Sequence, residues 1–463
     1  MGGSRASFYL YIIKLSVVSW ADLFISHLTR KGDWTMKKRV LLVGSGGREH
    51  ALAWKLCQSP ELGKLYVAPG NAGTNKIASN VPIEAIDIPG LLKFALKEKI
   101  DLTVVGPDDP LANGIVDIFQ AYGLHIFGPT QAAAQIEASK VFSKRLMRSS
   151  GVPTAPFKVI GSSTGALVLA RKHFRKSDES FVLKADGLAL GKGVYICKNL
   201  TEARTAIDEI MIRRIHGSAG NRVIAEDFAE GLEVTTHVFC DGKSYKLFPS
   251  AQDHKPIFNG DEGPNTGGMG AIAPVPWFTI DHKKFVEQRI LDPILHALRE
   301  IGRPFVGLLY PGLKVPSEGP VVLEFNARFG DPETQVYMPL LKTDLLEIFE
   351  ACVNGQLHKI NVEWNPGFAA CIVMASVGYP APDYKKGMVI TGIDRAETLP
   401  GVVVFHAGTK YVDGKLVTSG GRVLGVTGIG LTLYEAINRA YNGVECIHFE
   451  GMQYRRDIGV KSL

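Results

Sequence analysis

Short apolar runs alternate with stretches of helical periodicity through residues 36–137. Strands are predicted where β-branched and apolar residues cluster, and helices where apolar residues recur one turn apart. The predicted strands are Arg39–Val43, Lys64–Val67, Leu102–Val105 and His125–Phe127, and the predicted helices include His50–Cys57 and Pro89–Lys99. Alternation of strand and helix is typical of a parallel α/β sheet, so we expect one here.

The two ends of the chain differ from this pattern. In residues 1–35 the apolar run Phe8–Ala21 is interrupted by Lys14 and is too short to span a membrane. We interpret residues 1–35 as a leader outside the fold or a misread start, with Met36 as the functional beginning; a targeting peptide is the alternative. After a predicted helix (Asp344–Val353), residues 361–367 resemble a linker, and the strand-rich remainder predicts a small α/β module. We find no chemistry in that module.

The segment VVLEFNARFGDPE (residues 321–333) begins as a buried strand. Side chains alternate between the two faces of a strand, so Glu324, Asn326 and Arg328 are expected on one face. A carboxylate and an amide oxygen can hold magnesium, and a guanidinium can bind phosphate oxygens. This pattern predicts a metal and phosphate site at the strand end. The alternative is an exposed edge face with a solvated salt bridge.

A glycine-rich segment, FVLKADGLALGKGVYIC, covers residues 181–197. Its spacing is one residue short of a Walker P-loop, and Gly193 stands where a Ser or Thr would bind magnesium. A strand pattern follows instead of a helix, which predicts a β-loop-β flap. Glycines such as Gly191 and Gly193 would let its backbone close over phosphates, and Lys184 and Lys192 would neutralise them. The alternative is an ordinary flexible hairpin.

The turn GSGGREH (residues 44–50) has the glycines of a phosphate-binding turn. It is not a dinucleotide fingerprint, because Glu49 occupies the position of the third glycine. Gly46 and Gly47 would direct backbone N–H groups toward an anion at a helix N-terminus, and Arg48 would add charge. A tight turn without a ligand is the alternative.

Two further segments are candidates for binding. RVIAEDFAEGLE (residues 222–233) ends a short strand and could be an adenine-binding hinge at Glu226, Asp227 and Phe228, with Glu233 near the ribose. Residues 250–269 have little apolar periodicity, so we expect a long functional loop. Its polar candidates are Asp253, Lys255, Asn265, Thr266, Gly267 and Gly268. We expect His254 to be a structural hydrogen-bonding residue.

Composition excludes several classes of protein. The chain has 463 residues, which predicts about three domains, and 46% hydrophobic content is ordinary for a soluble protein. A formal net charge of +6 without long basic runs gives no support for nucleic-acid binding. The six cysteines are scattered without a C-x-x-C pair, which indicates a reducing compartment and no zinc site. We therefore expect a cytoplasmic protein that binds neither nucleic acid nor membrane.

The motifs GSGGREHALAWKL, APGNAGT, KADGLALGKGV, QDHK, GPNTGGMGA and EFNARFGDPETQ occur in this order. Together they closely resemble the phosphoribosylamine–glycine ligase family, also called glycinamide ribonucleotide synthetases, which are ATP-grasp enzymes of purine biosynthesis. The resemblance runs from Met36 to the last residues. It implies an α/β protein with a parallel N-terminal domain (36–137), an ATP-grasp domain (138–360) whose small lid covers about 155–229, and a C-terminal α/β domain (361–463).

The resemblance also implies roles for residues. Lys140, Lys184, Gly191, Lys192, Gly193, Glu226, Asp227, Phe228 and Glu233 would bind ATP, and Glu324 and Asn326 would bind Mg²⁺ or Mn²⁺. Gly46, Gly47, Asn71, Gly73 and Thr74 would form the phosphoribosylamine pocket, with Asn265, Thr266, Gly267 and Gly268 as further substrate-binding residues. Arg328, Lys255 and Asp253 are the catalytic candidates.

The implied reaction ligates glycine to 5-phosphoribosylamine through glycyl phosphate, and a monomer is expected. Two alternatives remain open. The first is another ATP-grasp enzyme, either a different carboxylate–amine ligase or a biotin-type carboxylase. The second is a nucleotide-binding module without catalysis, for which the metal-binding face would have no use.

Overall fold

The computed structural model describes residues 37–188 and 193–463. The chain divides into two compact units, Met1–Lys37 and Lys38–Leu463, and the following account concerns the second. The predicted leader and the predicted phosphate-binding residues Gly191 and Lys192 lie outside the described residues. Among the helices that the structure describes, none is long and apolar enough to cross a membrane.

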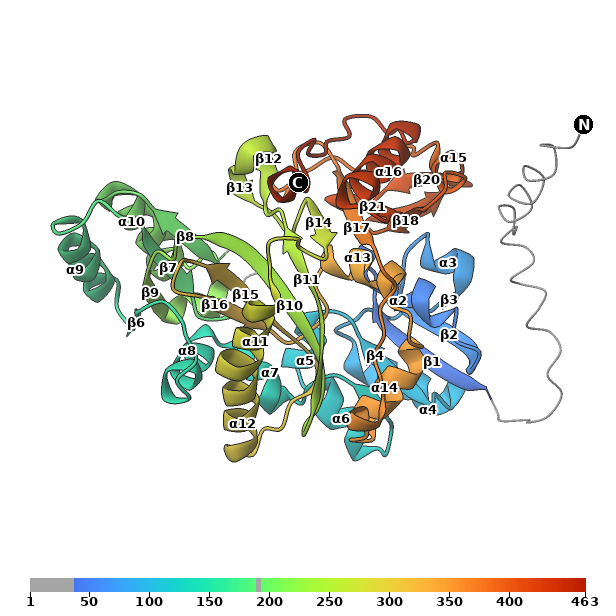
Figure 1. The fold of residues 1–463 in the computed structure, drawn as a ribbon, viewed down its shortest axis with the longest axis horizontal. Helices are drawn as coiled ribbons and strands as arrows, with labels where there is room; N and C mark the ends of the chain where they lie inside the picture. Colours follow the sequence, from blue (N-terminus) through green and yellow to red (C-terminus); the bar gives the residue numbers. More distant parts are fainter. Residues whose placement is uncertain (1–36, 189–192) are drawn as a thin grey trace, which may run out of the picture. The chain divides into compact units, whose positions relative to one another are not determined.

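The N-terminal part is a parallel sheet, as predicted (Figure 1). It has five strands in the order β3-β2-β1-β4-β5, and the short strand β3 was not among the four predicted strands. Its strands are β1 (Lys38–Gly44), β2 (Leu62–Pro69), β3 (Ser79–Asn80), β4 (Leu102–Val105) and β5 (Ile126–Phe127). Its helices are α2 (Gly47–Leu56), α3 (Thr74–Ile77), α4 (Ile88–Glu98), α5 (Asp108–Ala112), α6 (Ile115–Ala121) and α7 (Gln131–Ala138). Because β1, β2 and β4 are adjacent and parallel, the turns after them lie at one edge of the sheet.

The second sheet is a small antiparallel one, which we call the lid, reached through helix α8 (Lys140–Ser149). Its strands, in the order β6-β9-β7-β8, are β6 (Phe157–Ile160), β7 (Phe181–Ala185), β8 (Val194–Cys197) and β9 (Val223–Asp227). Helices α9 (Ser163–Phe174) and α10 (Leu200–Ile207) pack on it through small buried alanines (Figure 1). Strands β7 and β8 pair with Lys184 opposite Val194, so the predicted β-loop-β flap is confirmed.

An eight-stranded sheet with antiparallel pairing forms the remainder, in the order β16-β15-β10-β11-β14-β17-β21-β18. Its strands are β10 (Leu232–Asp241), β11 (Tyr245–Asp253), β14 (Gly270–Ala273), β15 (Val306–Val315), β16 (Val321–Asn326), β17 (Phe368–Ala375), β18 (Val402–His406) and β21 (Arg422–Gly430). Strand β14 pairs with β17, so the C-terminal strands extend the sheet that carries β16. The sequence pattern did not predict this continuity.

Helices and two small hairpins complete the chain. The helices are α11 (Ile280–Val286), α12 (Asp292–Glu300), α13 (Glu333–Leu340), α14 (Leu345–Val353), α15 (Ile393–Glu397) and α16 (Leu433–Cys446). The hairpins are β12 (Pro256–Phe258) with β13 (Glu262–Asn265), and β19 (Thr409–Val412) with β20 (Lys415–Thr418). The expectation of a long loop over residues 250–269 was therefore wrong in part. Strands of three or four residues are too short to show an alternating pattern.

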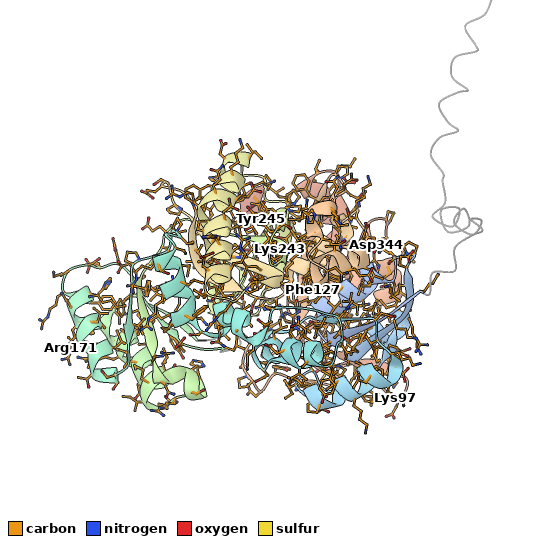
Figure 2. The ribbon with its side chains drawn as sticks, turned by 90° about the horizontal axis from the view of Figure 1, so that it is seen from below. Lys97, Phe127, Arg171, Lys243, Tyr245 and Asp344 are labelled. Carbon is orange, nitrogen blue, oxygen red and sulfur yellow. The ribbon has the colours of Figure 1, made fainter. Side chains whose placement is uncertain are left out.

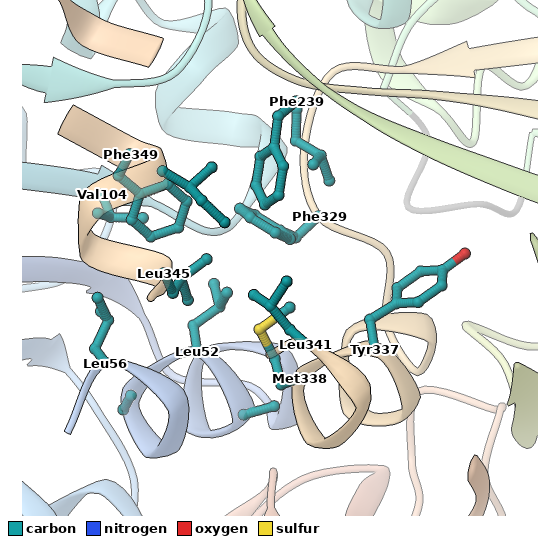
Figure 3. Packing of buried hydrophobic residues seen from close by; sticks show 14 of the residues in the cluster. Leu52, Leu56, Val104, Phe239, Phe329, Tyr337, Met338, Leu341, Leu345 and Phe349 are labelled. Atoms are coloured by element: carbon teal, nitrogen blue, oxygen red, sulfur yellow. The ribbon is translucent and has the colours of Figure 1, made fainter. Parts of the chain in front are cut away.

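A shared core joins the N-terminal sheet to the segment after β16. Leu52 and Leu56 of α2 pack with Met338 of α13, Leu345 of α14 and Phe329, and all five side chains are buried (Figure 3). The surface of the molecule is polar in contrast to this core: Lys97 and Arg171 are exposed on the outside of α4 and α9 (Figure 2). The packing holds the turn between β1 and α2 against the end of β16.

Candidate functional site

A cavity of about 560 Å³ lies between the lid and strands β15 and β16. Most of the residues predicted for ATP, metal and catalysis line it, together with three of those predicted for substrate binding, although they come from distant parts of the sequence. They are Lys140, Lys184, Gly193, Glu226, Asp227, Phe228, Glu233, Asp253, Lys255, Asn265, Thr266, Gly267, Glu324, Asn326 and Arg328. The structure therefore brings the separate motifs to one site.

The predicted metal-binding face stands on β16, with one correction. The strand ends at Asn326, so Arg328 lies beyond it and strand alternation does not place its side chain. The guanidinium nevertheless returns to the cavity, where it donates a hydrogen bond to Oδ1 of Asn326 at 3.1 Å. Burial raises the pKa of Glu324, but the charges of three lysines and Arg328 outweigh burial and leave the pKa below its ordinary value. Glu324 is thus an anion in a cationic site.

The donor set fits a divalent metal that also binds phosphate. Among the described residues, no group of three or more His, Cys, Asp or Glu side chains is arranged to hold a metal ion alone. Glu324 and Asn326 offer two hard oxygen ligands, and magnesium is typically bound by one or two carboxylates together with substrate phosphates. The buried Nδ2 of Asn326 has no hydrogen-bond partner among the described residues, which leaves a donor for a phosphate oxygen.

Arg328 has a buried partner that the sequence pattern did not reveal. Glu137, at the end of α7, faces the Arg328 guanidinium with Oε1 3.3 Å from Nε, and its Oε2 accepts a hydrogen bond from the Ala327 N–H at 2.7 Å. Burial raises the pKa of Glu137 to about 7, and the charge of Arg328 opposes this. Its sequence position gave no clue, because one Glu at the end of a helix is common.

Buried charges cluster where ATP phosphates were predicted to bind. Lys184 of β7 and Lys144 of α8 each have Nζ 3.0 Å from a different oxygen of the Glu226 carboxylate. Lys184 also donates to the Leu323 carbonyl of β16 at 3.1 Å, so the lid contacts the catalytic strand directly. Glu226 was predicted as part of an adenine-binding hinge, and this stays a prediction; its carboxylate pairs with the two lysines.

Lys144 is a lining residue that sequence reasoning missed. It follows Lys140 by four residues on α8, and residues at that spacing share one face of a helix. That spacing was the available clue. Burial lowers the pKa of Lys144 to about 8, although the charge of Glu226 raises it. Lys140 itself donates a hydrogen bond to the Gly187 carbonyl at 3.0 Å.

A second charged group surrounds Glu233. Its carboxylate lies 3.4 Å from Nζ of Lys255 and 3.6 Å from Nζ of Lys314, and these charges lower the pKa of Glu233, Lys255 more than Lys314. The charge of Glu233 in turn raises the pKa of Lys255 well above its usual value, so Lys255 is a permanent cation. Burial and the charge of Glu333 raise the pKa of Asp253. Lys255 thus suits charge stabilisation better than proton transfer.

The structure places His254 as the structural residue we expected. It is buried, and its Nε2 accepts a hydrogen bond from the Gly459 N–H at 3.1 Å. The ring therefore links the segment of residues 250–269 to residues near the end of the chain.

The five residues predicted for the phosphoribosylamine pocket lie together, but they are not in the lining of this cavity. Nδ2 of Asn71 donates to the carbonyls of Ser45, Gly46 and His406, and Oδ1 accepts from the N–H groups of Gly73 and Thr74. The amide is thus fully used in holding the loop.

Glu49 also limits the predicted phosphate cradle at the start of α2. Its carboxylate accepts a hydrogen bond from the Gly46 N–H at 2.6 Å and pairs with Nε of Arg48 at 2.6 Å. Two of the three groups proposed for the cradle are thus engaged, so an anion here would rely on the Gly47 N–H and other donors or need a change in Glu49.

Three family models match the chain. The N domain of phosphoribosylglycinamide synthetase matches residues 38–137, its ATP-grasp (A) domain matches 138–334, and its C domain matches 369–461. A phosphoribosylamine–glycine ligase from Rhodopirellula baltica is 47% identical over 430 residues, covering 92% of this chain and 98% of that one. A trifunctional purine biosynthetic protein from Gallus gallus is 47% identical over 432 residues, 92% of this chain and 42% of that one.

Solved structures agree with the sequence matches. A phosphoribosylamine–glycine ligase from Thermotoga maritima superposes with a TM-score of 0.77 at 34% identity, covering 91% of this chain and 100% of that one. The biotin carboxylase domain of a 2-oxoglutarate carboxylase from Hydrogenobacter thermophilus superposes with a TM-score of 0.69 at 15% identity. The match covers 90% of this chain and 91% of that one. At that identity the second likeness concerns the fold alone.

Proposed function

The chain belongs to the phosphoribosylglycinamide synthetase family, and from this premise we propose that it ligates glycine to 5-phosphoribosylamine. The products would be glycinamide ribonucleotide, ADP and phosphate, a step of purine biosynthesis. One observation carries the proposal: a single cavity holds the lid lysine Lys184, the acidic face of β16 and the substrate loop with Asn265 and Thr266. A site of this kind can keep a nucleotide phosphate and an acceptor in contact.

The chemistry follows from the weakness of a carboxylate as an electrophile. An oxygen of the glycine carboxylate attacks the γ-phosphorus of ATP, the bond to the β,γ-bridging oxygen breaks, and ADP leaves. The product is glycyl phosphate. The amine nitrogen of phosphoribosylamine then attacks its carbonyl carbon, loses a proton and expels phosphate. Both steps move negative charge between oxygens, so fixed cations in the cavity lower the barrier.

The described residues divide this work. Lys140, Lys144 and Lys184 face the phosphate end, and Glu324 with Asn326 would hold Mg²⁺ or Mn²⁺, which neutralises phosphate charge when bound. We propose that Arg328, oriented by Glu137, holds the glycyl phosphate, since a guanidinium matches the geometry of phosphate oxygens. Closure of the lid excludes water, which would otherwise hydrolyse the acyl phosphate.

Release of ADP is the direct test. We expect ADP to form only when glycine and phosphoribosylamine are both supplied with magnesium and ATP, together with glycinamide ribonucleotide in equal amount. ADP release that requires a different amino acid or amine would indicate another ligase, and release that requires bicarbonate and biotin would indicate a carboxylase. ATP binding without turnover under all these conditions would leave a nucleotide-binding module.

Assembly, metal and location are parts of the same proposal. We propose a monomer that works in the cytoplasm with magnesium or manganese. All six cysteines are free, which is typical of a reducing compartment. Light scattering should give a mass near 50.3 kDa, and twice that mass would contradict the monomer.

A further inference from the structure

The C-terminal strands begin next to the active site. Strand β21 starts at Arg422 and lies between β17 and β18 in the sheet that also carries β16. Its backbone pairs with β17 along its length. A side chain at the start of such a strand stands on a rigid base, which is where a positioning residue is most effective.

The Arg422 guanidinium joins two loops of the site. Its Nη1 donates hydrogen bonds to the carbonyl of Gly267 at 2.6 Å and to that of Asp331 at 2.7 Å, and the Gly268 carbonyl lies at 3.4 Å. Its Nη2 lies 3.3 Å from Oδ2 of Asp331. One cation thus satisfies three backbone carbonyls and one carboxylate. Lysine, with a single ammonium group, would not reproduce this arrangement.

The two loops touch each other at Gly268. Its φ of +111° suits glycine, and a Cβ there would lie 2.4 Å from Cδ of Pro332 and 2.6 Å from Oδ1 of Asp253. The Gly267 N–H donates to the hydroxyl of Tyr379, in the turn after β17, at 3.0 Å, which is a second contact from the C-terminal part. Of these loops, Thr266, Gly267 and Asp331 line the cavity. The loop conformation therefore depends on contacts from outside the ATP-grasp part.

We propose that Arg422 is a positioning residue that sets the acceptor side of the cavity, a role that rests on the proposed function for its substrates. It holds the loop 265–268 against the turn at Asp331, so that donors and acceptors of that loop meet the glycine or amine substrate. The phosphate end of the cavity, at Lys144 and Lys184, has no contact with Arg422 among the described residues. Loss of Arg422 should therefore affect the acceptor substrates and spare ATP.

The variant Arg422→Gln tests this with two readouts. We expect kcat/KM for glycine and phosphoribosylamine to fall about 10²-fold, the cost of misplacing a reacting group, while KM for ATP changes less than about twofold. Hydrogen exchange at the amides of Thr266, Gly267 and Gly268 should accelerate. Hydrogen exchange needs no substrate, so it tests the positioning role independently of the reaction. If the parent chain failed to release ADP with these substrates, that failure would count against the proposed function alone.

Controls separate positioning from stability. Arg439→Gln removes an arginine of α16 whose guanidinium contacts Glu435 and the Ile429 carbonyl, and it should leave both readouts unchanged. Tyr379→Phe removes only the acceptor for the Gly267 N–H and should give a smaller change in the same direction. This variant replaces Arg422→Gln as the test if Arg422→Gln does not fold. Parent-like kinetics and exchange in Arg422→Gln would overturn the proposal. So would an equal loss for ATP and glycine with a lowered melting temperature.

Discussion

Glu226 is the charge partner of two buried lysines, so neutralising it tests the arrangement of the phosphate end. The carboxylate stands between Lys144 and Lys184, and the side chains of the three residues are 2–6% exposed. The change Glu226→Gln keeps the shape and removes the charge. It leaves two buried ammonium groups without the carboxylate that they contact, a condition that proteins rarely tolerate.

The magnitude follows from the geometry. Each lysine–carboxylate pair at 3.0 Å corresponds to about 5–6 kcal/mol of Coulomb attraction at an effective dielectric constant of about 20. Desolvation of the charges offsets much of this, and breaking a buried pair by removing one partner costs about 3–5 kcal/mol. Because burial already lowers the pKa of Lys144 to about 8, the variant can relieve part of the cost by deprotonating Lys144. The loss should therefore be largest near pH 6 and smaller near pH 9.

Urea unfolding and thermal melting at these two pH values measure the effect, and steady-state kinetics gives KM for ATP. We expect weaker ATP use at both pH values, because a neutral or displaced lysine stabilises phosphate charge less. Glu230→Gln is the matched control, since Glu230 is exposed on the same segment. A free energy of unfolding for Glu226→Gln at pH 6 within about 0.5 kcal/mol of that of the parent would show that the buried lysines do not need this carboxylate.

Three further changes examine other parts of the site. Glu324→Ala should lower glycine-dependent turnover about 10²–10³-fold and weaken its magnesium dependence, whereas Phe325→Leu should alter only packing; an unchanged rate in the first would refute the metal role. Glu137→Gln should lower turnover by misplacing Arg328 while ATP affinity holds, and equal losses in both would indicate a general defect. The folded-state pKa of Lys144 is about 8 and its ordinary value is 10.5, so the parent should gain stability as the pH rises through this interval. Lys144→Met should abolish this gain. If the urea midpoint of the variant still rises over the same interval, another group causes the gain.

Local patterns were sufficient for four of the five strands of the N-terminal sheet and for the pairing of β7 with β8. The predicted strands there contain short runs of buried, mostly apolar residues, such as Leu102–Val105, and parallel strands buried on both faces have that appearance. The β7–β8 hairpin followed from glycines between two apolar runs. In these cases the information lies within ten or twenty residues, where period and turn chemistry act.

Contacts between distant segments were beyond those patterns. Alternation indicates the face on which a residue of β16 lies, but not that Glu137 of α7 stands opposite Arg328, and not that β17 would pair with β14 about 100 residues earlier. The strand also ends two residues before Arg328, which reaches the cavity from a bend. Tertiary packing, rather than local propensity, decides such positions.

The C-terminal part therefore supports the cavity that we propose as the active site, although its own sequence carries no catalytic pattern. Arg422 holds one end of the substrate loop, and the buried Arg455 holds the hairpin β12–β13 before it, through an ion pair with Asp261 at 2.9 Å and a hydrogen bond to the Pro256 carbonyl at 3.2 Å. Asp457 accepts a further hydrogen bond from the Gly260 N–H at 2.8 Å. Both ends of the loop are thus fixed by side chains of one part of the chain. A rigid outer support of this kind would keep the acceptor side of the proposed site in place for the second step of the proposed reaction.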